Sequence, residues 1–374
     1  MEHWLALKRI EGIGNIGFKN LLATCRSPKN VFEAPYSFLT SVPGIGKIGA
    51  SRIKAFNAWR TVEKELKTAE QLQVNIVTCL DDQYPKHLLH IYDYPPLLYV
   101  KGILKTDDIN IAVVGSRSAS TYGKYSTEKL CRELAFHGVT VVSGMARGID
   151  TAAHRGALAG KGRTIAILGC GMDIIYPHEN EKLYHDISAH GAVITEFSFG
   201  MPPNAPNFPA RNRIISGISL GVVVVEATDK SGSLITARLA VEQGREVFAI
   251  PGSIDSPGSK GTNKLIKEGA KLVENVRDIL EEVEPQIGKN VFKADVGQAR
   301  GHQKNPDLKD RPFDNMILSP EENVILSAVS SKPVDVNTII SSAGRKAGDV
   351  LNILLQLELK GLVTQLPGKK FIRN

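Results

Sequence analysis

The densest group of side chains able to bind both an anion and a base is an aromatic ring followed by two arginines, Phe208, Arg211 and Arg213. Arginine supplies a fixed charge and planar donors for phosphate, and an exposed aromatic ring can stack on an unpaired base. We therefore predict that these three side chains contact nucleic acid. The alternative is that Phe208 lies in the core and that one arginine pairs with Glu196 or Glu226.

Loops rich in glycine, serine and basic residues follow several of the predicted strands. Small residues let an anion approach the backbone, hydroxyl groups donate hydrogen bonds, and the helix after each loop directs its positive end to the anion. The residues from which we predict phosphate contacts are Gly115, Ser116, Arg117, Ser143, Gly144, Arg147, Ser231, Lys260 and Asn263. Because ligands bind beyond the carboxyl ends of parallel strands, these loops should form one extended track for a polyanion.

Acid–base catalysis is a second interpretation of the same region. Asp150 and His154 lie one helical turn apart, and Glu226 is a further acidic side chain, but no nucleophile accompanies them at a recognisable spacing. Asp150 is better explained as a helix N-cap, and His154 as a side chain that hydrogen-bonds within the structure. We therefore predict no catalytic residues and no enzyme activity.

Motifs for common cofactors and metals are missing from the sequence. The chain has no G-x-x-x-x-G-K-[ST] loop, which argues against ATP hydrolysis by a P-loop mechanism. Its nine histidines and four cysteines show no zinc-ligand spacing. The loop after the first strand of the α/β region is not G-x-G-x-x-G, the nucleotide fingerprint. We predict no metal and no nicotinamide, flavin or other cofactor.

Alternating strands and helices from residue 110 onwards predict the scaffold for these loops. The predicted strands are the apolar runs at 111–114, 139–142, 164–168, 192–195, 222–225 and 247–250. Runs that are apolar throughout are typical of parallel strands buried on both faces, and stretches between them, such as 124–136, have the length of helices. We predict an α/β fold with an extended Rossmann-like, doubly wound and mainly parallel sheet.

The N-terminal segment contains an internal repeat. Gly12-Ile13-Gly14-Asn15-Ile16-Gly17 recurs as Gly44-Ile45-Gly46-Lys47-Ile48-Gly49. Both copies fit G-x-G-x-x-G, but a helix rather than a strand is predicted before the first, so the dinucleotide interpretation fails. The pattern instead predicts paired helix-hairpin-helix (SAM-like) motifs, whose backbone N–H groups can hold a DNA phosphate. The alternative is a small helical bundle in which the glycines only make turns.

The C-terminal part contains two kinds of segment, a linker and a small folded domain. A stretch with few apolar residues and several prolines predicts a flexible linker. After it, one apolar helix face and a hairpin with a basic tip predict a winged helix, which binds duplex DNA or other proteins. The predicted domains are a helical domain at 1–72, a Rossmann-like domain at 73–283, a linker at 284–318 and a winged helix at 319–374.

Composition narrows the cellular setting. The 374 residues include 46 lysines and arginines against 39 aspartates and glutamates, and the net charge of +7 modestly favours a polyanionic partner. The four scattered cysteines are typical of reduced thiols in a cytosol. The N-terminus lacks a signal-peptide pattern and no apolar run could span a bilayer, so we predict a cytoplasmic protein without membrane contact.

Taken together and in order, the loops resemble the DNA-processing protein A (DprA/Smf) family. The matching stretches are 113–117, 143–150 with His154, 167–171 leading to Tyr176-Pro177, 208–216, 231–237 and 244–252. The similarity covers most of residues 84–270, and each stretch recurs at the spacing of the family. The helical N-terminal segment and the winged helix also match the longer members.

The resemblance implies a single-stranded-DNA-binding protein that protects incoming DNA in natural transformation and loads a RecA-type recombinase onto it. It also implies a homodimer, and it places the DNA-binding pocket at Gly115, Ser116 and Arg117 and at Phe208 with the arginines that follow. One departure is Ala205, where some members carry a basic residue, so one basic contact of those members is missing here.

Two other functions are alternatives. The first is a Rossmann-like enzyme that binds nucleotides or cleaves nucleoside monophosphates. Such enzymes usually carry Pro-Gly-Gly-x-Gly-Thr-x-x-Glu, which Pro251-Gly252-Ser253 and Gly261-Thr262-Asn263 do not reproduce. The second is a transcription regulator that acts through the winged helix and prefers duplex DNA to single strands.

Overall fold

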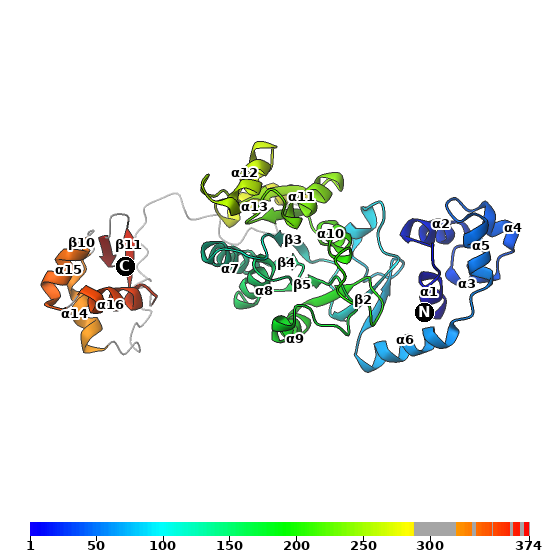
Figure 1. The fold of residues 1–374 in the computed structure, drawn as a ribbon, viewed down its shortest axis with the longest axis horizontal. Coiled ribbons are helices and arrows are strands. Elements are labelled where there is room, and N and C mark those ends of the chain that lie inside the picture. Colours follow the sequence, from blue (N-terminus) through cyan, green and yellow to red (C-terminus); the bar gives the residue numbers. More distant parts are fainter. Residues whose placement is uncertain (288–318, 331–333, 346, 360–361, 367–369, 374) are drawn as a thin grey trace. The chain divides into compact units, whose positions relative to one another are not determined.

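The computed structural model describes residues 1–287, 319–330, 334–345, 347–359, 362–366 and 370–373. The chain divides into two compact units, one ending at Val296 and the other beginning at Gly297 (Figure 1). The predicted linker at 284–318 lies outside the described residues except for 284–287, which end helix α13 (Val276–Ile287). Its role as a linker stays a prediction.

A nine-stranded sheet forms the centre of the first unit, in the order β1-β2-β6-β5-β4-β3-β7-β8-β9. Its strands are β1 (Asn75–Thr78), β2 (Leu97–Gly102), β3 (Ile109–Val114), β4 (Val139–Ser143), β5 (Thr164–Ile167), β6 (Ala192–Thr195), β7 (Gly221–Val224), β8 (Glu246–Ala249) and β9 (Lys271–Leu272). Neighbouring strands from β3 to β9 pair in parallel, while β1 and β2 run antiparallel at one edge. The predicted doubly wound, mainly parallel sheet is confirmed.

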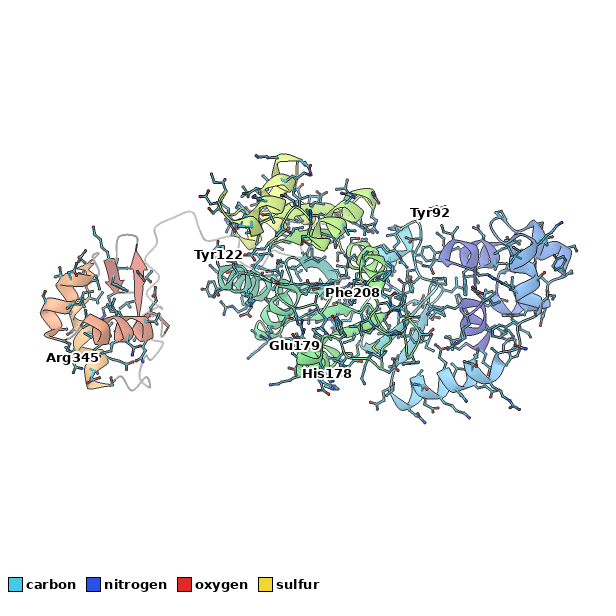
Figure 2. The ribbon with its side chains drawn as sticks, viewed as in Figure 1. Tyr92, Tyr122, His178, Glu179, Phe208 and Arg345 are labelled. Carbon is cyan, nitrogen blue, oxygen red and sulfur yellow. The ribbon has the colours of Figure 1, made fainter. Side chains whose placement is uncertain are left out.

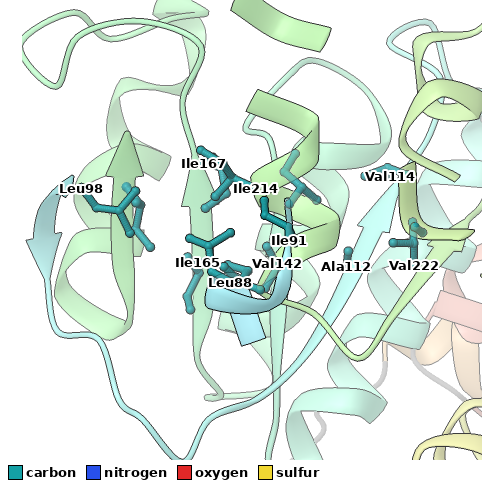
Figure 3. Close-up of a cluster of buried hydrophobic side chains, with 14 of the residues drawn as sticks. Leu88, Ile91, Leu98, Ala112, Val114, Val142, Ile165, Ile167, Ile214 and Val222 are labelled. Atoms are coloured by element: carbon teal, nitrogen blue, oxygen red, sulfur yellow. The ribbon is translucent and has the colours of Figure 1, made fainter. Parts of the chain in front are cut away.

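Helices cover both faces of this sheet. They are α7 (Thr121–Phe136), α8 (Ile149–Ala159), α9 (Glu181–His190), α10 (Asn207–Gly217), α11 (Gly232–Glu242), α12 (Lys260–Lys267) and α13, with short 3-10 segments η1 (Lys86–His90), η2 (His178–Asn180) and η3 (Pro257–Ser259). On one face Ile214 of α10 and Leu88 of η1 pack on strand residues such as Ile167 (Figure 3). On the other face Leu134 of α7 and Ile149 of α8 pack on the opposite sides of β3, β4 and β7. Burial on both faces explains why the strands are apolar throughout.

The strand order reverses at β3, which has β4 on one side and β7 on the other. Connections leave such a pair of strands towards opposite faces, so a crevice opens at their carboxyl ends. Ser120 accepts a hydrogen bond from the Gly123 N–H at 2.9 Å and thereby caps α7. Glu226, just after β7, accepts from the Ser120 N–H at 2.9 Å and from its hydroxyl at 2.5 Å. The loop after β3 is therefore tied to the end of β7.

The N-terminal segment is helical, as predicted. Its helices are α1 (Glu2–Lys8), α2 (Asn15–Cys25), α3 (Pro28–Glu33), α4 (Tyr36–Ser41), α5 (Gly46–Lys54) and α6 (Trp59–Gln71). Arg52 donates to the Glu11 carbonyl at 2.7 Å, and Asn20 donates to the Pro43 carbonyl at 2.9 Å. These donors occupy equivalent positions of the two repeats, and so do the acceptors. Each glycine-rich turn is thus held by a side chain from the other repeat.

The two turns differ in their surroundings. Asn15 donates to the Asp93 carbonyl at 3.1 Å and Lys19 to the Tyr92 carbonyl at 2.6 Å, so the first turn faces the sheet domain. Ile48, beside the second turn, is 71% exposed. DNA contact by this helical segment stays a prediction, and the second turn is the better candidate for it.

The second unit is a winged helix, as predicted. Its described elements are α14 (Pro320–Ala328), β10 (Val334–Asp335), α15 (Val336–Ala343), α16 (Ala347–Leu359), β11 (Val363–Leu366) and β12 (Lys370–Arg373). The strands form a small antiparallel sheet in the order β10-β12-β11. Ile325, Ile339 and Leu354 from the three helices form its core. None of the described helices in either unit is both long enough and apolar enough to cross a bilayer.

A buried carboxylate joins the helical segment to the sheet. Glu65 on α6 accepts hydrogen bonds from the Tyr99 hydroxyl of β2 at 2.5 Å and from Arg9 Nε at 2.7 Å. The Glu65 side chain is only 2% exposed, whereas that of Arg9 is 29% exposed. Two donors from different segments therefore depend on one acceptor.

We expect Glu65→Ala to lower the free energy of unfolding by about 2–3 kcal/mol, because it leaves a buried hydroxyl and a partly buried guanidinium without their acceptor. Urea unfolding followed by the fluorescence of Trp4 and Trp59 measures the change, since both tryptophans lie in the helical segment. Glu63→Ala removes an exposed carboxylate from the same helix and should change little. Equal losses in the two variants would contradict the role given to Glu65.

Candidate nucleic-acid interface

A cavity of about 740 Å³ opens where the strand order reverses, at the carboxyl ends of β3, β4 and β7. Its lining includes Gly115, Ser116, Arg117, Ala146, Asp150, Tyr176, Phe208, Arg211, Asn212, Thr228, Ser231, Gly232 and Ser233. Gly232 and Ser233 begin α11, so the positive end of a helix faces the cavity. Hydroxyl groups, a guanidinium and a helix N-terminus together suit a phosphate ligand.

Arg117, Phe208 and Tyr176 form a cluster at the cavity wall, in which the Tyr176 ring is tilted by 44° relative to the Phe208 ring. The Arg117 guanidinium carbon lies 5.0 Å from the centroid of the Phe208 ring, and the Tyr176 ring centroid lies 5.7 Å from it. Arg117 and Tyr176 are exposed, while Phe208, which is labelled in Figure 2, is half-buried. The loop that carries Arg117 is held because the Ile149 N–H donates to the Ser116 carbonyl at 3.1 Å. A charged group and two rings are thus available to solvent on a supported loop.

Arg211 lies next to Phe208 in this cluster and is 3% exposed. Its Nη1 donates to the Gly144 carbonyl at 2.6 Å and also to the Ile167 carbonyl, and its Nε donates to Asn212 Oδ1 at 3.1 Å. Burial lowers the pKa of Arg211 to about 10, although the nearby Asp150 carboxylate opposes the shift. Most of its donors are satisfied by the protein, so Arg211 supports the loops after β4 and β5 and the Phe208 ring 5.8 Å away.

Arg213 points away from the cavity. Its guanidinium pairs with Glu196 at 2.5 Å and with Asp93 at 3.1 Å, and the residue is 9% exposed. The sequence left open that one of the two arginines pairs with Glu196. Arg213 is the arginine that does so. The physical reason is helical periodicity, because side chains two residues apart on a helix point in different directions.

The other predicted residues separate into two groups. Gly144 and Arg147 line a second cavity of about 60 Å³ that shares Arg117, Tyr176 and Phe208 with the first, and Arg147 forms an ion pair with Glu179. Ser143, Lys260 and Asn263 line neither cavity. The buried Ser143 hydroxyl donates a hydrogen bond to the Val113 carbonyl at 2.6 Å. The Asn263 side-chain amide accepts a hydrogen bond from the Gly252 N–H and donates one to the Gly252 carbonyl. Lys260 is exposed at the start of α12.

Several cavity residues were not predicted from the sequence. Tyr176 and Asn212 are the most informative, because one adds a ring beside Phe208 and the other orients Arg211. Tyr176 follows β5 in a loop that carries glycines, which is the signal that would have found it. Asn212 lies between the two arginines, but only the fold shows which arginine it contacts.

Asp150 and His154 are both structural, but Asp150 is not the predicted helix N-cap, because Gly148 occupies that position and Asp150 lies in the first turn of α8. Asp150 Oδ2 accepts hydrogen bonds from the Gly144 N–H at 3.1 Å and the Ala146 N–H at 3.3 Å, and burial raises its pKa against the opposing effect of Arg211. His154 is fully buried, and its Nδ1 lies 2.7 Å from the Thr164 hydroxyl. Burial lowers the pKa of His154 to about 3. The pair is therefore not arranged for proton transfer to a ligand in the cavity.

The stretch Gly217-Ile218-Ser219-Leu220-Gly221 fits the G-x-S-x-G pattern of serine hydrolases. Ser219 is fully buried, however, and its hydroxyl donates to the Ile215 carbonyl at 2.9 Å. It follows the C-terminus of α10 and precedes β7, whereas a nucleophile elbow lies between a strand and the next helix. This serine is not a nucleophile.

The fold and the cavity define an extended Rossmann-like protein with a cationic, aromatic site at its switch point. A family comparison supports this class, since residues 75–284 match the family described as DNA recombination-mediator protein A. Residues 309–369 match the DprA winged helix domain. The chain belongs to the DprA family.

Several relatives show how far the similarity extends. Protein Smf of Escherichia coli is 41% identical over 319 residues, which cover 83% of this chain and 80% of that protein. The structure of DNA processing protein A from Streptococcus pneumoniae superposes with a TM-score of 0.66 and 37% identity, covering 75% of this chain and 98% of the other. That from Helicobacter pylori gives a TM-score of 0.52 and 32% identity, covering 57% of this chain and 98% of the other.

Burial of His154 leads to a prediction about pH. The folded protein keeps this imidazole neutral down to about pH 3, whereas the unfolded chain takes up a proton near the ordinary value of 6.5. Protonation therefore favours the unfolded state, and the stabilisation present above pH 6.5 is lost as the pH falls. Between about pH 6.5 and about pH 5 the loss should be roughly 2 kcal/mol.

Denaturant unfolding at a series of pH values measures this loss. His154→Gln should flatten the pH dependence below 6.5, because the buried group no longer titrates. His185→Gln changes an exposed histidine and should leave the wild-type dependence intact. If wild type and His154→Gln lose the same stability on acidification, the assignment to His154 is wrong.

Proposed function

We propose that this protein binds single-stranded DNA as part of DNA processing, protects the strand in natural transformation and loads a RecA-type recombinase onto it. It acts in the cytoplasm as a homodimer and is not an enzyme. Support comes from the family, because the Helicobacter pylori relative is described by its single-stranded-DNA binding mode and the Streptococcus pneumoniae relative as a DNA processing protein. Recombinase loading, dimerisation and the role in transformation rest on the family resemblance.

The observation that carries the DNA-binding proposal is the cluster of the exposed Arg117 and Tyr176 with the half-buried Phe208, all three lining one cavity. A guanidinium over a ring offers a charge to phosphate and leaves aromatic surface for a base, which are the two contacts that a single strand presents. Duplex DNA hides the faces of its bases within the stack. The site therefore favours single strands over duplexes.

Fewer residues are assigned to direct DNA contact here than the sequence analysis predicted. We assign phosphate contact to Arg117, Ser116 and Ser231, with close backbone approach at Gly115, since all four line the cavity. Lys260 is exposed beyond the cavity and would extend the cationic surface along the sheet edge. The remaining predicted residues, Ser143, Gly144, Arg147, Arg211, Arg213 and Asn263, have backbone or ion-pair partners within the protein and act by supporting the loops.

A nucleotide-cleaving enzyme is the second candidate, favoured by the Asp150 carboxylate in the cavity wall. One Asp150 oxygen, however, accepts two backbone N–H groups, and His154 is enclosed away from the cavity. Incubation of the protein with nucleoside monophosphates separates the candidates. Release of free base, abolished by Asp150→Asn, would establish the enzyme and contradict our assignment.

Arg117→Ala tests the phosphate contact. We expect at least about ten-fold weaker binding of a single-stranded oligonucleotide at moderate salt, because a charged hydrogen bond contributes about 1.5–3 kcal/mol. The slope of log affinity against log salt should fall by about 0.7 for each phosphate that the variant no longer neutralises. Fluorescence anisotropy across a salt series measures both. Arg155→Ala removes an exposed arginine on α8 with the same change in net charge and should leave the slope unaltered.

Phe208→Ala tests base stacking at the same site. Stacking of one base on an aromatic ring contributes about 1–3 kcal/mol, so affinity should fall by roughly 5- to 150-fold. The salt slope should stay close to that of the wild type because no charge is removed. Phe208→Tyr keeps a ring and should bind nearly as well as the wild type. A slope that falls as far as in Arg117→Ala would show that Phe208 only positions the arginine.

A further inference from the structure

We infer that Tyr122 and Tyr125 on α7 form a second base-stacking surface, which receives the single strand after it leaves the Arg117 cavity. This inference rests on the proposed function, because it extends the path of the bound single-stranded DNA along the same edge of the sheet. Tyr122 and Tyr125 are 68% and 67% exposed. They lie three residues apart in the first turns of α7 and so occupy one face of the helix.

The two rings line a cavity of about 350 Å³. Its other walls include Lys129 of α7, Pro251 just after β8, and Glu274 and Asn275 just after β9. A space of this size accommodates a nucleobase beside the rings. Both tyrosines therefore border a concave surface rather than projecting singly from a flat one.

The position of this cavity continues the Arg117 site. β3, β7, β8 and β9 are adjacent parallel strands, so their carboxyl ends lie on one edge of the sheet. The Arg117 loop leaves that edge at β3, and Pro251 and Glu274 follow β8 and β9 on the same edge. α7 begins at Thr121, four residues after Arg117, so one connection carries both sites. Tyr122 and Phe208 are both marked in Figure 2.

The chemistry of the lining favours a base over a protein surface. The cores of protein–protein interfaces are depleted of charged side chains, whereas this cavity contains Lys129, Glu133 and Glu274. Carboxylates and the Asn275 amide can accept hydrogen bonds from the exocyclic amino groups of bases while the tyrosine rings stack on base faces. A nucleobase uses every type of group that the cavity presents.

Charges around the rings make this a stacking site rather than a phosphate site. The charged side chains that line the cavity are Lys129, Glu133 and Glu274. With one positive and two negative charges, the surface adds little attraction for phosphates. Affinity gained here should therefore depend weakly on salt, in contrast to the affinity gained at Arg117.

The test compares Tyr122→Ala/Tyr125→Ala with Phe136→Ala in the full chain. Phe136 is 80% exposed at the other end of α7, so it is a matched aromatic residue distant from the sheet edge that carries the site. Oligo(dT) of about 6 nucleotides should fill the Arg117 cavity, and a mixed-sequence strand of about 16 nucleotides should reach α7. Anisotropy with both lengths, at several salt concentrations, measures affinity and slope.

We expect the double alanine variant to match the wild type on the short strand and to bind the long strand about 10-fold or more weakly, with an unchanged salt slope. Phe136→Ala should bind both strands like the wild type. Tyr122→Phe/Tyr125→Phe should restore long-strand binding, because stacking needs the rings and not the hydroxyl groups.

Three outcomes overturn the inference. The first is an unchanged affinity of the double alanine variant for the long strand while Arg117→Ala still weakens binding, which leaves the proposed function standing. The second is an equal loss in Phe136→Ala. The third is a change in molar mass of the double variant without DNA, measured by light scattering, which would identify the face as a contact between copies. If the wild type binds neither strand, the proposed function fails as well.

Discussion

The guanidinium of Arg211 is almost fully buried, and it donates to the carbonyl of Gly144, just after β4, and to that of Ile167, the last residue of β5. One side chain therefore joins the carboxyl ends of two neighbouring strands. An alanine Cβ at Gly144 would overlap this guanidinium, so glycine is required for the close approach. Phe208, one helical turn earlier, rests on the same group. The ring presented to a ligand is therefore positioned by an arginine that does not reach the ligand.

The parallel sheet imposes the second constraint. Because β3 has β4 on one side and β7 on the other, the loops after these strands separate and leave room for a ligand between them. The Ser120 contacts to Glu226 limit that separation on the α7 side, and an alanine Cβ at Gly123 would overlap the Glu226 carboxylate. The cavity is thus bordered by the beginnings of α10 and α11, and the loop before α7 is held against the end of β7.

Arg213, in the middle of α10, connects this helix to the N-terminal segment through Glu196. Arg213 pairs with Glu196 and Asp93, and the Lys8 ammonium donates to the Glu196 carbonyl. Burial lowers the pKa of Lys8 to about 8, although Glu196 opposes the shift. The helical segment and the candidate interface are therefore linked through Glu196. A helix held at Arg211 and at Arg213 can present Phe208 in one orientation, which lowers the entropy lost when a DNA strand binds.

Much of the fold follows from local patterns that the sequence determines by itself. Apolar runs bounded by glycine identify the parallel strands, and the loops after them include Arg117 and Ser231 at the cavity. The roles of the two α10 arginines could not be separated in this way, because their environment comes from β5, β6 and the segment before β2. Tyr176 likewise joins the site only through tertiary contact with Phe208. Periodicity predicts which face of an element is buried, but the partner of a buried charge is chosen by packing between segments distant in the chain.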